Sequence, residues 1–315
     1  DFITSVSTGS LYGDLLAFQF AEWLETTAYP SGRVIVEAGA HDGRLAGDIL
    51  AWIKEHRPDL FRELNYWILE PSLSRQRWQQ STLKAFVDNI RWARDFTELT
   101  GGCDNGKIKG IVFSNELLDA FPVHRYGWDM AGKHWFEWGV AADGDNFVWA
   151  RLGKPEFSLA NGELEAVLPD GYTIETSPAA QSWWRDAAGI LGQGRLLAID
   201  YGFTADEIFL PSRLKGTLRA YSRHRVSDDL LADPGGQDLT AHVNFSAIQN
   251  AGESAGLKTG GFFTQAKFLT QILAKTEAGG NFGAWNPSRS RQLQTLTHPE
   301  HFGRAFHVLL QARGV

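Results

Sequence analysis

The chain has 315 residues, of which 43% are hydrophobic and 21% charged, the balance of an ordinary globular protein with one large domain or two modest ones. Its formal net charge of −7 disfavours a nucleic-acid partner, because such proteins concentrate Lys and Arg on one face. No apolar run approaches the roughly 20 residues that cross a bilayer, so we expect no membrane span. The single cysteine, Cys103, has no partner for an internal disulfide.

Short β-branched apolar runs alternate with stretches of helical periodicity in the first third of the chain. This alternation predicts βαβ units and therefore an α/β fold, with a mainly parallel, doubly wound sheet covered by helices on both faces. The predicted strands span residues 33–38, 66–71, 90–93 and 108–114, and the predicted helices span 45–52 and 72–86.

The pattern changes after Pro122. Residues 135–149 predict a β-hairpin with an Asp-Gly turn, and a helix at 178–191 and a strand at 195–200 then resume the sheet. The segment 203–243 reads as irregular, and loops of that length are usually functional. From residue 262 onward we expect mostly helix. We therefore expect a single domain over residues 1–315, in which insertions at about 122–175 and 203–243 form a cap on the substrate side.

The segment 37–45, with the sequence EAGAHDGRL, lies between a predicted strand and a predicted helix. Glycines allow the backbone to approach a ligand, and the N-terminus of the following helix offers unpaired N–H groups to an anionic group. A G-x-G-x-x-G fingerprint counted from Gly39 would place glycines at His41 and Arg44, so NAD is disfavoured. The spacing instead resembles the E/D-x-G-x-G-x-G loop of S-adenosylmethionine (SAM) methyltransferases, with His41 in place of the middle glycine.

Polar residues also lie at the carboxyl ends of the other predicted strands, where an open α/β sheet binds its ligands. Glu70 is placed to accept hydrogen bonds from ribose hydroxyls, and the alternative is a carboxylate that faces water. Asp95 and Phe96 resemble the methyltransferase position beside adenine. Asn115 and Glu116 should point at the reaction centre, or they could instead cap and support the next helix.

Several motifs in a fixed order resemble the MidA-like family of SAM methyltransferases, from the first residue to the last third of the chain. Its mitochondrial members assist the assembly of respiratory complex I, so the resemblance implies a class I Rossmann-like sheet, SAM as cofactor and protein arginine N-methylation. The motifs are DFITS at 1–5, LYGDLL at 11–16, the loop at 37–45, LEPS at 69–72, NELLDAFPVH at 115–124, DYG at 200–202, QDLTAHV at 237–243 and QAKFL at 265–269.

The resemblance also implies roles for single residues. For SAM binding these are Thr4, Gly39, Ala40, His41, Gly43, Glu70, Asp95, Phe96 and Asn115. Glu116, Asn115 and Asp119 are the catalytic candidates, and Glu116 could orient a guanidinium group through paired N–H bonds. Separately from the resemblance, polar residues near the predicted mouth of the site give the substrate candidates His124, Tyr201, Tyr221, His224 and His242. His242 and Asp238 lack a companion at ligand spacing, so no metal site is predicted.

Three functions stay open at this point. A protein or peptide methyl acceptor is favoured by the resemblance and by the insertions. A small-molecule methyltransferase on the same scaffold would suit the many aromatic residues. A SAM-binding assembly factor without turnover is kept open by His41. A homodimer is also left open, and the expected location is the cytoplasm of a bacterium or the mitochondrial matrix of a eukaryote.

Overall fold

The structure is a computed structural model that describes residues 4–27, 33–101, 103–153, 155, 165–222, 225–227, 229–277 and 285–315. The chain divides into two compact units. We call them the sheet unit, made of Phe2–Leu117, Trp183–Tyr201 and Gln249–Val315, and the insertion unit, made of Leu118–Ser182 and Gly202–Ile248. Both insertions that the sequence predicts fall mainly within the insertion unit.

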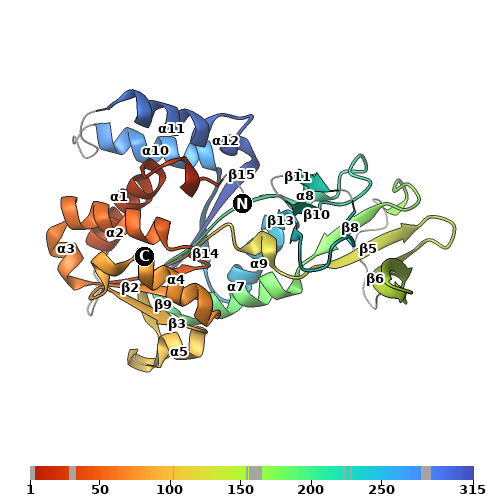
Figure 1. The fold of residues 1–315 in the computed structure, drawn as a ribbon, viewed down its shortest axis with the longest axis horizontal. Coiled ribbons are helices and arrows are strands. Elements are labelled where there is room, and N and C mark those ends of the chain that lie inside the picture. The colour runs from red at the N-terminus through yellow and green to blue at the C-terminus, as the bar shows by residue number, and fades with distance from the viewer. Residues whose placement is uncertain are drawn as a thin grey trace. The chain divides into compact units, whose positions relative to one another are not determined.

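The sheet unit is built on a mixed, mainly parallel sheet with the strand order β14-β15-β9-β4-β1-β2-β3 (Figure 1). The first four strands in chain order, β1 to β4, lie within two residues of their predicted positions. β-branched side chains fill β1 and are buried at its centre. The strands are β1 Arg33–Ala38, β2 Leu64–Leu69, β3 Ile90–Ala93, β4 Ile108–Asn115, β9 Leu191–Phe203, β14 Lys258–Thr264 and β15 Phe306–Arg313.

Helices cover 265–277, 287–297 and 302–305 of the tail, as expected, but the chain also ends in the strand β15, which the sequence did not predict. β15 pairs antiparallel with β9 on one side and with β14 on the other. Its apolar residues are buried because the strand lies inside the sheet, and this pairing with distant segments outweighs local helix preference. β9 is also longer than the predicted strand at 195–200, and its last two residues pair with β13, Val243–Asn244.

The main hydrophobic core of the sheet unit lies between the sheet and a layer that includes α1, α2 and α10. Helix α1 is buried over most of its length, and α1, α10 and α11 lie against one another (Figure 1). The predicted helix at 72–86 ends earlier, at Thr82, and a short 3-10 turn follows. The helices and 3-10 turns are η1 Val6–Thr8, α1 Leu11–Thr26, α2 Arg44–His56, α3 Pro58–Glu63, α4 Leu73–Thr82, η2 Lys84–Phe86, α5 Phe96–Thr100, η3 Asp104–Gly106, α7 Pro178–Ile190, α9 Phe245–Ser254, α10 Gln265–Glu277, α11 Pro287–Thr297 and α12 Phe302–Ala305.

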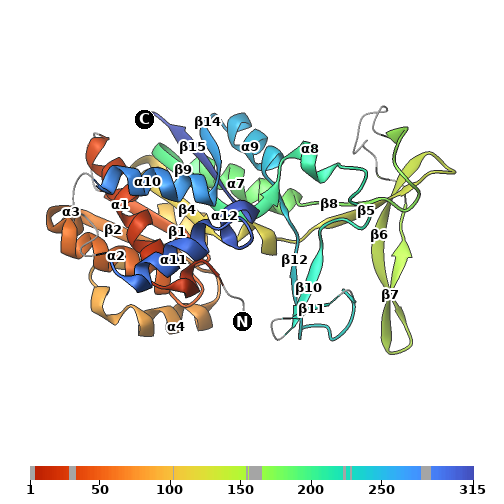
Figure 2. The ribbon, with the colours of Figure 1, turned by 90° about the horizontal axis from the view of Figure 1, so that it is seen from above.

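The insertion unit holds two small antiparallel sheets, with the orders β7-β6-β5-β8 and β11-β10-β12. The predicted hairpin is present as β6 and β7, the long ribbon visible in Figure 2, but the two residues of its turn are Gly144 and Asp145 instead of Asp-Gly. The segment 203–243 is not irregular, because it contains the three-stranded sheet. The elements are η4 Leu118–Ala120, β5 His124–Asp129, β6 His134–Asp143, β7 Asn146–Arg151, β8 Thr173–Thr176, α8 Ala205–Ile208, β10 Arg219–Ser222, β11 Arg225–Ser227 and β12 Asp238–Thr240.

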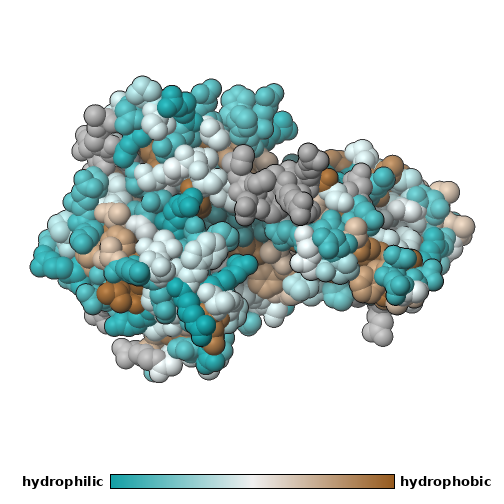
Figure 3. Space-filling model, viewed as in Figure 1, coloured by the Kyte–Doolittle hydropathy of each residue, from teal (hydrophilic) through white to brown (hydrophobic). Residues whose placement is uncertain are grey.

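The aromatic residues of the insertion unit explain part of the high aromatic content. Trp128, Trp135 and Tyr172 are buried together with Tyr126 in a core of their own. The face of the molecule in Figure 3 is mostly hydrophilic with apolar side chains scattered over it. Among the described residues, no helix combines the length and the apolar character that a membrane crossing requires.

Candidate cofactor and acceptor site

The parallel strands of the sheet unit end at the same level, which gathers the predicted site residues at one edge. Ala38 pairs in register with Leu69 on β2 and with Ser114 on β4, and Leu69 pairs with Ala93 on β3. The residues that follow these positions include Gly39, Glu70 and Asn115. The register thus accounts for the convergence of three sequence motifs at the edge where open α/β sheets bind ligands.

The glycine-containing loop joins β1 to α2 by a tight turn. Gly39 has a φ of +74°, and a Cβ atom there would lie 2.9 Å from the Leu117 side chain. Gly43, with a φ of +84°, directly precedes α2, and its N–H donates to the Ala40 carbonyl at 2.7 Å. The loop therefore leaves bare backbone beside a helix N-terminus, an arrangement suited to an anionic group.

His41 stands in the place of the usual middle glycine and adopts the backbone conformation that a glycine would favour. Its φ is +47°, its side chain is 70% exposed, and its ring lies edge-on to Trp78 at 5.2 Å between centroids. The left-handed conformation costs a non-glycine residue about 1–2 kcal/mol. His41 thus adopts a left-handed conformation of the kind that the usual glycine would favour.

Glu70 is buried directly after β2 and is tied to the glycine loop through Gln79 of α4. The Ser72 N–H donates to Glu70 Oε1 at 2.9 Å, and Gln79 Nε2 lies 3.3 Å from Glu70 Oε2 and 3.1 Å from the His41 carbonyl. Gln79 Oε1 in turn accepts from Trp92 Nε1 at 3.0 Å. Sequence reasoning missed Gln79, because nothing in a polar helix of average composition distinguishes it.

The residues after β3 have structural roles in their own right. The Asp95 carboxylate accepts a hydrogen bond from the Glu98 N–H at 2.8 Å and so caps α5. The ring of Phe96 lies 5.6 Å from that of Trp183. Thr4 is likewise engaged locally, since its Oγ1 accepts from the Ser7 N–H at 3.3 Å. Their proposed contacts with the cofactor stay predictions.

The backbone at the end of β4 holds Glu116 in a left-handed conformation with a φ of +53°. Its N–H donates to the Ile199 carbonyl at 2.9 Å, and the next N–H, of Leu117, donates to Asp200 Oδ2 at 3.2 Å. Asp200 is fully buried, and its Oδ1 also accepts from the Tyr201 N–H at 2.9 Å. Backbone strain of this kind concentrates at functional sites. The DYG motif was the only sequence signal for Asp200.

The side chains of Asn115 and Glu116 are hydrogen-bonded to each other and to helix α1. Asn115 Nδ2 donates to Glu116 Oε1 at 3.2 Å, and the Tyr12 hydroxyl donates to Asn115 Oδ1 at 2.5 Å. Burial, and then the charges of Glu116, Asp200 and Glu37, raise the pKa of the Tyr12 hydroxyl well above its ordinary value. Asn115 therefore does not act as the helix cap of the alternative interpretation, since β4 is followed by a 3-10 turn of three residues.

Glu37 opens the glycine loop motif and lies buried near the end of β1. Burial raises the pKa of its carboxyl group to about 7, against a hydrogen bond from the Tyr66 hydroxyl at 2.6 Å that lowers it. A carboxyl group that titrates near neutrality is typical of functional sites. On the neighbouring strand β4, Ser114 pairs with Ala38, and its buried hydroxyl has no hydrogen-bond partner among the described residues.

The remaining candidates are divided between the units. Tyr201 of the sheet unit packs edge-on against Phe306. In the insertion unit Asp119 is buried, its carbonyl accepting from the Ala241 N–H at 3.0 Å, and Tyr221 is half-buried on β10. His124 is exposed, with its Nδ1 2.6 Å from Glu137 Oε1. His224 and the first three residues of the N-terminal motif lie outside the described residues.

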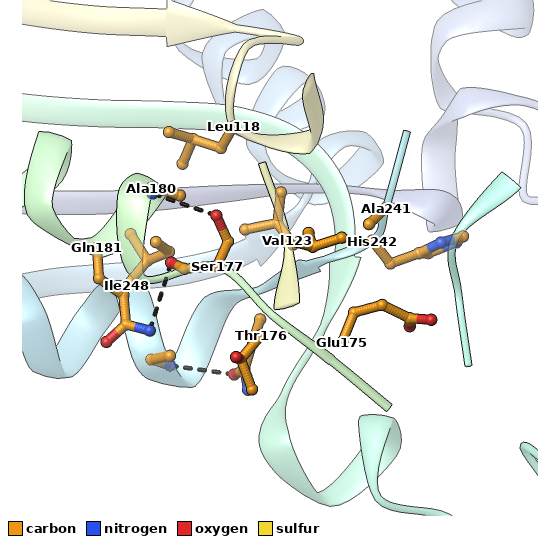
Figure 4. A pocket seen from close by; sticks show the side chains of 13 residues that line it. Leu118, Val123, Glu175, Thr176, Ser177, Ala180, Gln181, Ala241, His242 and Ile248 are labelled. Atoms are coloured by element: carbon orange, nitrogen blue, oxygen red, sulfur yellow. Dashed lines mark hydrogen bonds between the residues drawn. The ribbon is translucent and has the colours of Figure 1, made fainter. Parts of the chain in front are cut away.

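His242 lies in a small pocket inside the insertion unit (Figure 4). The pocket has a volume of about 30 Å³, enough for roughly one water molecule, and Ser177 and Gln181 also line it. The His242 ring stacks on Phe203 at 4.8 Å, and burial, then Arg213 and Arg219, lower its pKa to about 4. His242 is therefore neutral at pH 7. Among the described residues, no group of three His, Cys, Asp or Glu side chains could hold a metal ion.

The geometry at the sheet edge fits the adenosyl cofactor that the sequence implies. Gly39 and Gly43 supply bare backbone at a helix N-terminus, which suits the carboxylate of the methionine part. Glu70 is a carboxylate at the end of β2, the position that binds ribose hydroxyls in sheets of this kind. A buried hydroxyl without a partner, such as that of Ser114, is costly unless a ligand satisfies it.

Comparison with known proteins supports the same assignment. A family model described as S-adenosyl-L-methionine-dependent methyltransferase matches residues 15–263. A Burkholderia thailandensis protein whose crystal structure holds S-adenosyl-homocysteine is 31% identical, with a TM-score of 0.81, over 100% of this chain and 79% of its own. The mitochondrial protein arginine methyltransferase NDUFAF7 of Mus musculus is 26% identical over 98% of this chain and 73% of its own, and the NDUFAF7 homologue of Drosophila melanogaster is 24% identical over 100% and 75%.

The sheet-edge geometry and the relatives lead to one assignment. The sheet has the class I methyltransferase arrangement, and the resemblance read from the sequence motifs is confirmed. The chain belongs to the MidA-like family of methyltransferases, and it is an enzyme that uses S-adenosylmethionine as its cofactor.

Proposed function

We propose that this enzyme transfers the methyl group of SAM to a guanidinium nitrogen of an arginine side chain in a protein. The observation that carries the proposal is the fixed carboxylate of Glu116 at the cofactor edge of the sheet, held by a left-handed backbone and by the Asn115 amide. The relatives named protein arginine methyltransferase, 24–27% identical to this chain, support the choice of acceptor.

The chain's own residues would act by orientation. SAM supplies a methyl group on a positively charged sulfur, which leaves with the electron pair of the C–S bond. The Glu116 carboxylate accepts two N–H bonds from the guanidinium group and holds its positive charge away from the attacking nitrogen. That nitrogen forms the new N–C bond and releases one proton to water. Positioning of this kind supplies much of the barrier reduction in a displacement reaction.

We propose that the insertions at about 122–175 and 203–243 form the acceptor side of the site, because insertions of this length suit a polypeptide acceptor. Asp119, His124, Tyr201, Tyr221, His224 and His242 remain candidates for acceptor contacts. The relatives from mouse and fly are named mitochondrial, so the mitochondrial matrix is the proposed location for a eukaryotic source and the cytoplasm for a bacterial one.

The test is methyl transfer from tritiated SAM to peptides that each carry one arginine, with the Lys-substituted peptides as acceptor controls. Glu116→Gln should bind SAM within about twofold of the original chain in calorimetry and lose about 100-fold or more in turnover. Glu253→Gln is the matched control, because this exposed carboxylate accepts side-chain hydrogen bonds from Gln249 and Thr259. Wild-type turnover by Glu116→Gln would refute the assigned role. Transfer to small molecules alone would replace the protein acceptor.

A further inference from the structure

Helix α1 contributes one side chain to the acceptor site that the reaction described above does not use. Tyr12 lies in the LYGDLL motif near the start of α1, and its side chain is completely buried. Its hydroxyl nevertheless reaches across 103 positions of sequence to Asn115 Oδ1, at 2.5 Å. Asn115 in turn reaches Glu116 Oε1 at 3.2 Å. Hydrogen bonds thus connect the Tyr12 hydroxyl through Asn115 to the Glu116 carboxylate.

The charge on Glu116 determines which group donates and which accepts in each of these hydrogen bonds. An ionised carboxylate can only accept hydrogen bonds, so the Asn115 group that faces Glu116 must be the amide nitrogen. The Asn115 oxygen therefore faces Tyr12, and the Tyr12 hydroxyl must donate. If the Asn115 amide rotated by 180°, its oxygen would face the Glu116 oxygen and the two acceptors would repel. In the observed orientation the Tyr12 hydroxyl donates to the amide oxygen, so its loss would leave that oxygen without this hydrogen bond and loosen the hold of Asn115 on Glu116.

We propose that Tyr12 is a positioning residue for methyl transfer, which acts through Asn115 to hold the Glu116 carboxylate in the orientation that receives the acceptor. The inference rests on the proposed role of Glu116. Two further features suit Tyr12 to this task. The helix that carries it is buried between neighbouring layers, so the hydroxyl is held on a rigid element. Burial and the nearby carboxylates keep the hydroxyl protonated, and it remains a donor over the whole working pH range.

The test removes only the hydroxyl, with Tyr12→Phe, and measures two ligands by calorimetry. The first is S-adenosyl-homocysteine. The second is methylguanidine, the acceptor headgroup by itself, titrated in the presence of saturating S-adenosyl-homocysteine. Methylguanidine binding should weaken by about fivefold to tenfold, the worth of one oriented hydrogen bond, while the Kd of S-adenosyl-homocysteine should stay within about twofold. Tyr172→Phe is the control, because it removes another fully buried hydroxyl, which donates to the Ile208 and Leu210 carbonyls of the insertion unit.

A double-mutant cycle separates positioning from a general loss of stability. In a Glu116→Gln background the residue next to Asn115 is no longer an obligate acceptor, so Tyr12→Phe should cause no further loss of methylguanidine binding. Equal methylguanidine binding by Tyr12→Phe and the original chain, or additive losses in the double variant, would overturn the positioning role. If Glu116→Gln itself binds methylguanidine normally, the proposed function fails, and that result is distinct from a failure at Tyr12 alone.

Discussion

Replacing Gly39 with alanine should damage the cofactor loop in two ways that can be measured separately. At a φ of +74° an L-residue costs about 1–2 kcal/mol relative to glycine. The new Cβ would also lie 2.9 Å from Leu117 Cδ1, and relieving that overlap adds about 1–3 kcal/mol. The expected loss in the free energy of unfolding is therefore about 2–5 kcal/mol. Leu117 directly follows Glu116, so a backbone shift at Leu117 would also move the Glu116 carboxylate.

Urea unfolding and calorimetric titration with SAM would test this expectation, with Gly106→Ala as the matched control. Gly106 belongs to the same unit and has a φ of +63°, but a Cβ there would meet nothing within 4 Å. Gly106→Ala should lose only the part of the unfolding free energy that comes from the positive φ, about 1–2 kcal/mol, and it should bind SAM normally. If Gly39→Ala lost no more stability than Gly106→Ala and bound SAM equally well, the close approach of the loop to Leu117 would not matter as we argue.

Two further predictions concern the same loop. His41→Gly should keep SAM binding and raise the free energy of unfolding by up to about 1 kcal/mol. The gain from relieving the left-handed conformation is partly offset by the greater entropy of glycine in the unfolded chain. A loss of more than about 1 kcal/mol in urea unfolding would contradict this. Glu37 has a folded pKa of about 7, raised above its ordinary value, so its protonated form stabilises the fold at low pH and this contribution disappears as the pH rises through 7. Between pH 6 and 8 the original chain should therefore lose about 1 kcal/mol of stability relative to Glu37→Gln, and a constant difference would show that the Glu37 pKa is not raised.

The site was predictable from the sequence where local pattern and chemistry coincide. Gly39, Glu70 and Asn115 each follow a short apolar strand, and parallel strands bring their carboxyl ends to one edge, so their proximity could be anticipated. Gln79 carried no sequence signal, and Asp200 was marked only by its place in the DYG motif. Each acts by hydrogen bonds to backbone or side chains far away in the sequence, and neither has a spacing that marks it.

The sequence alone determined the first four strands of the sheet and the glycine loop between β1 and α2, because strands buried on both faces read as continuous β-branched runs and the turn needs its glycines. Only the tertiary structure decided that residues 306–313 form a strand, since their conformation is fixed by pairing with β9 and β14 and not by local preference. The tertiary structure also decided the left-handed backbone of Glu116 and the reach of Tyr12 to Asn115. Both depend on hydrogen bonds between segments that only the folded sheet brings within range.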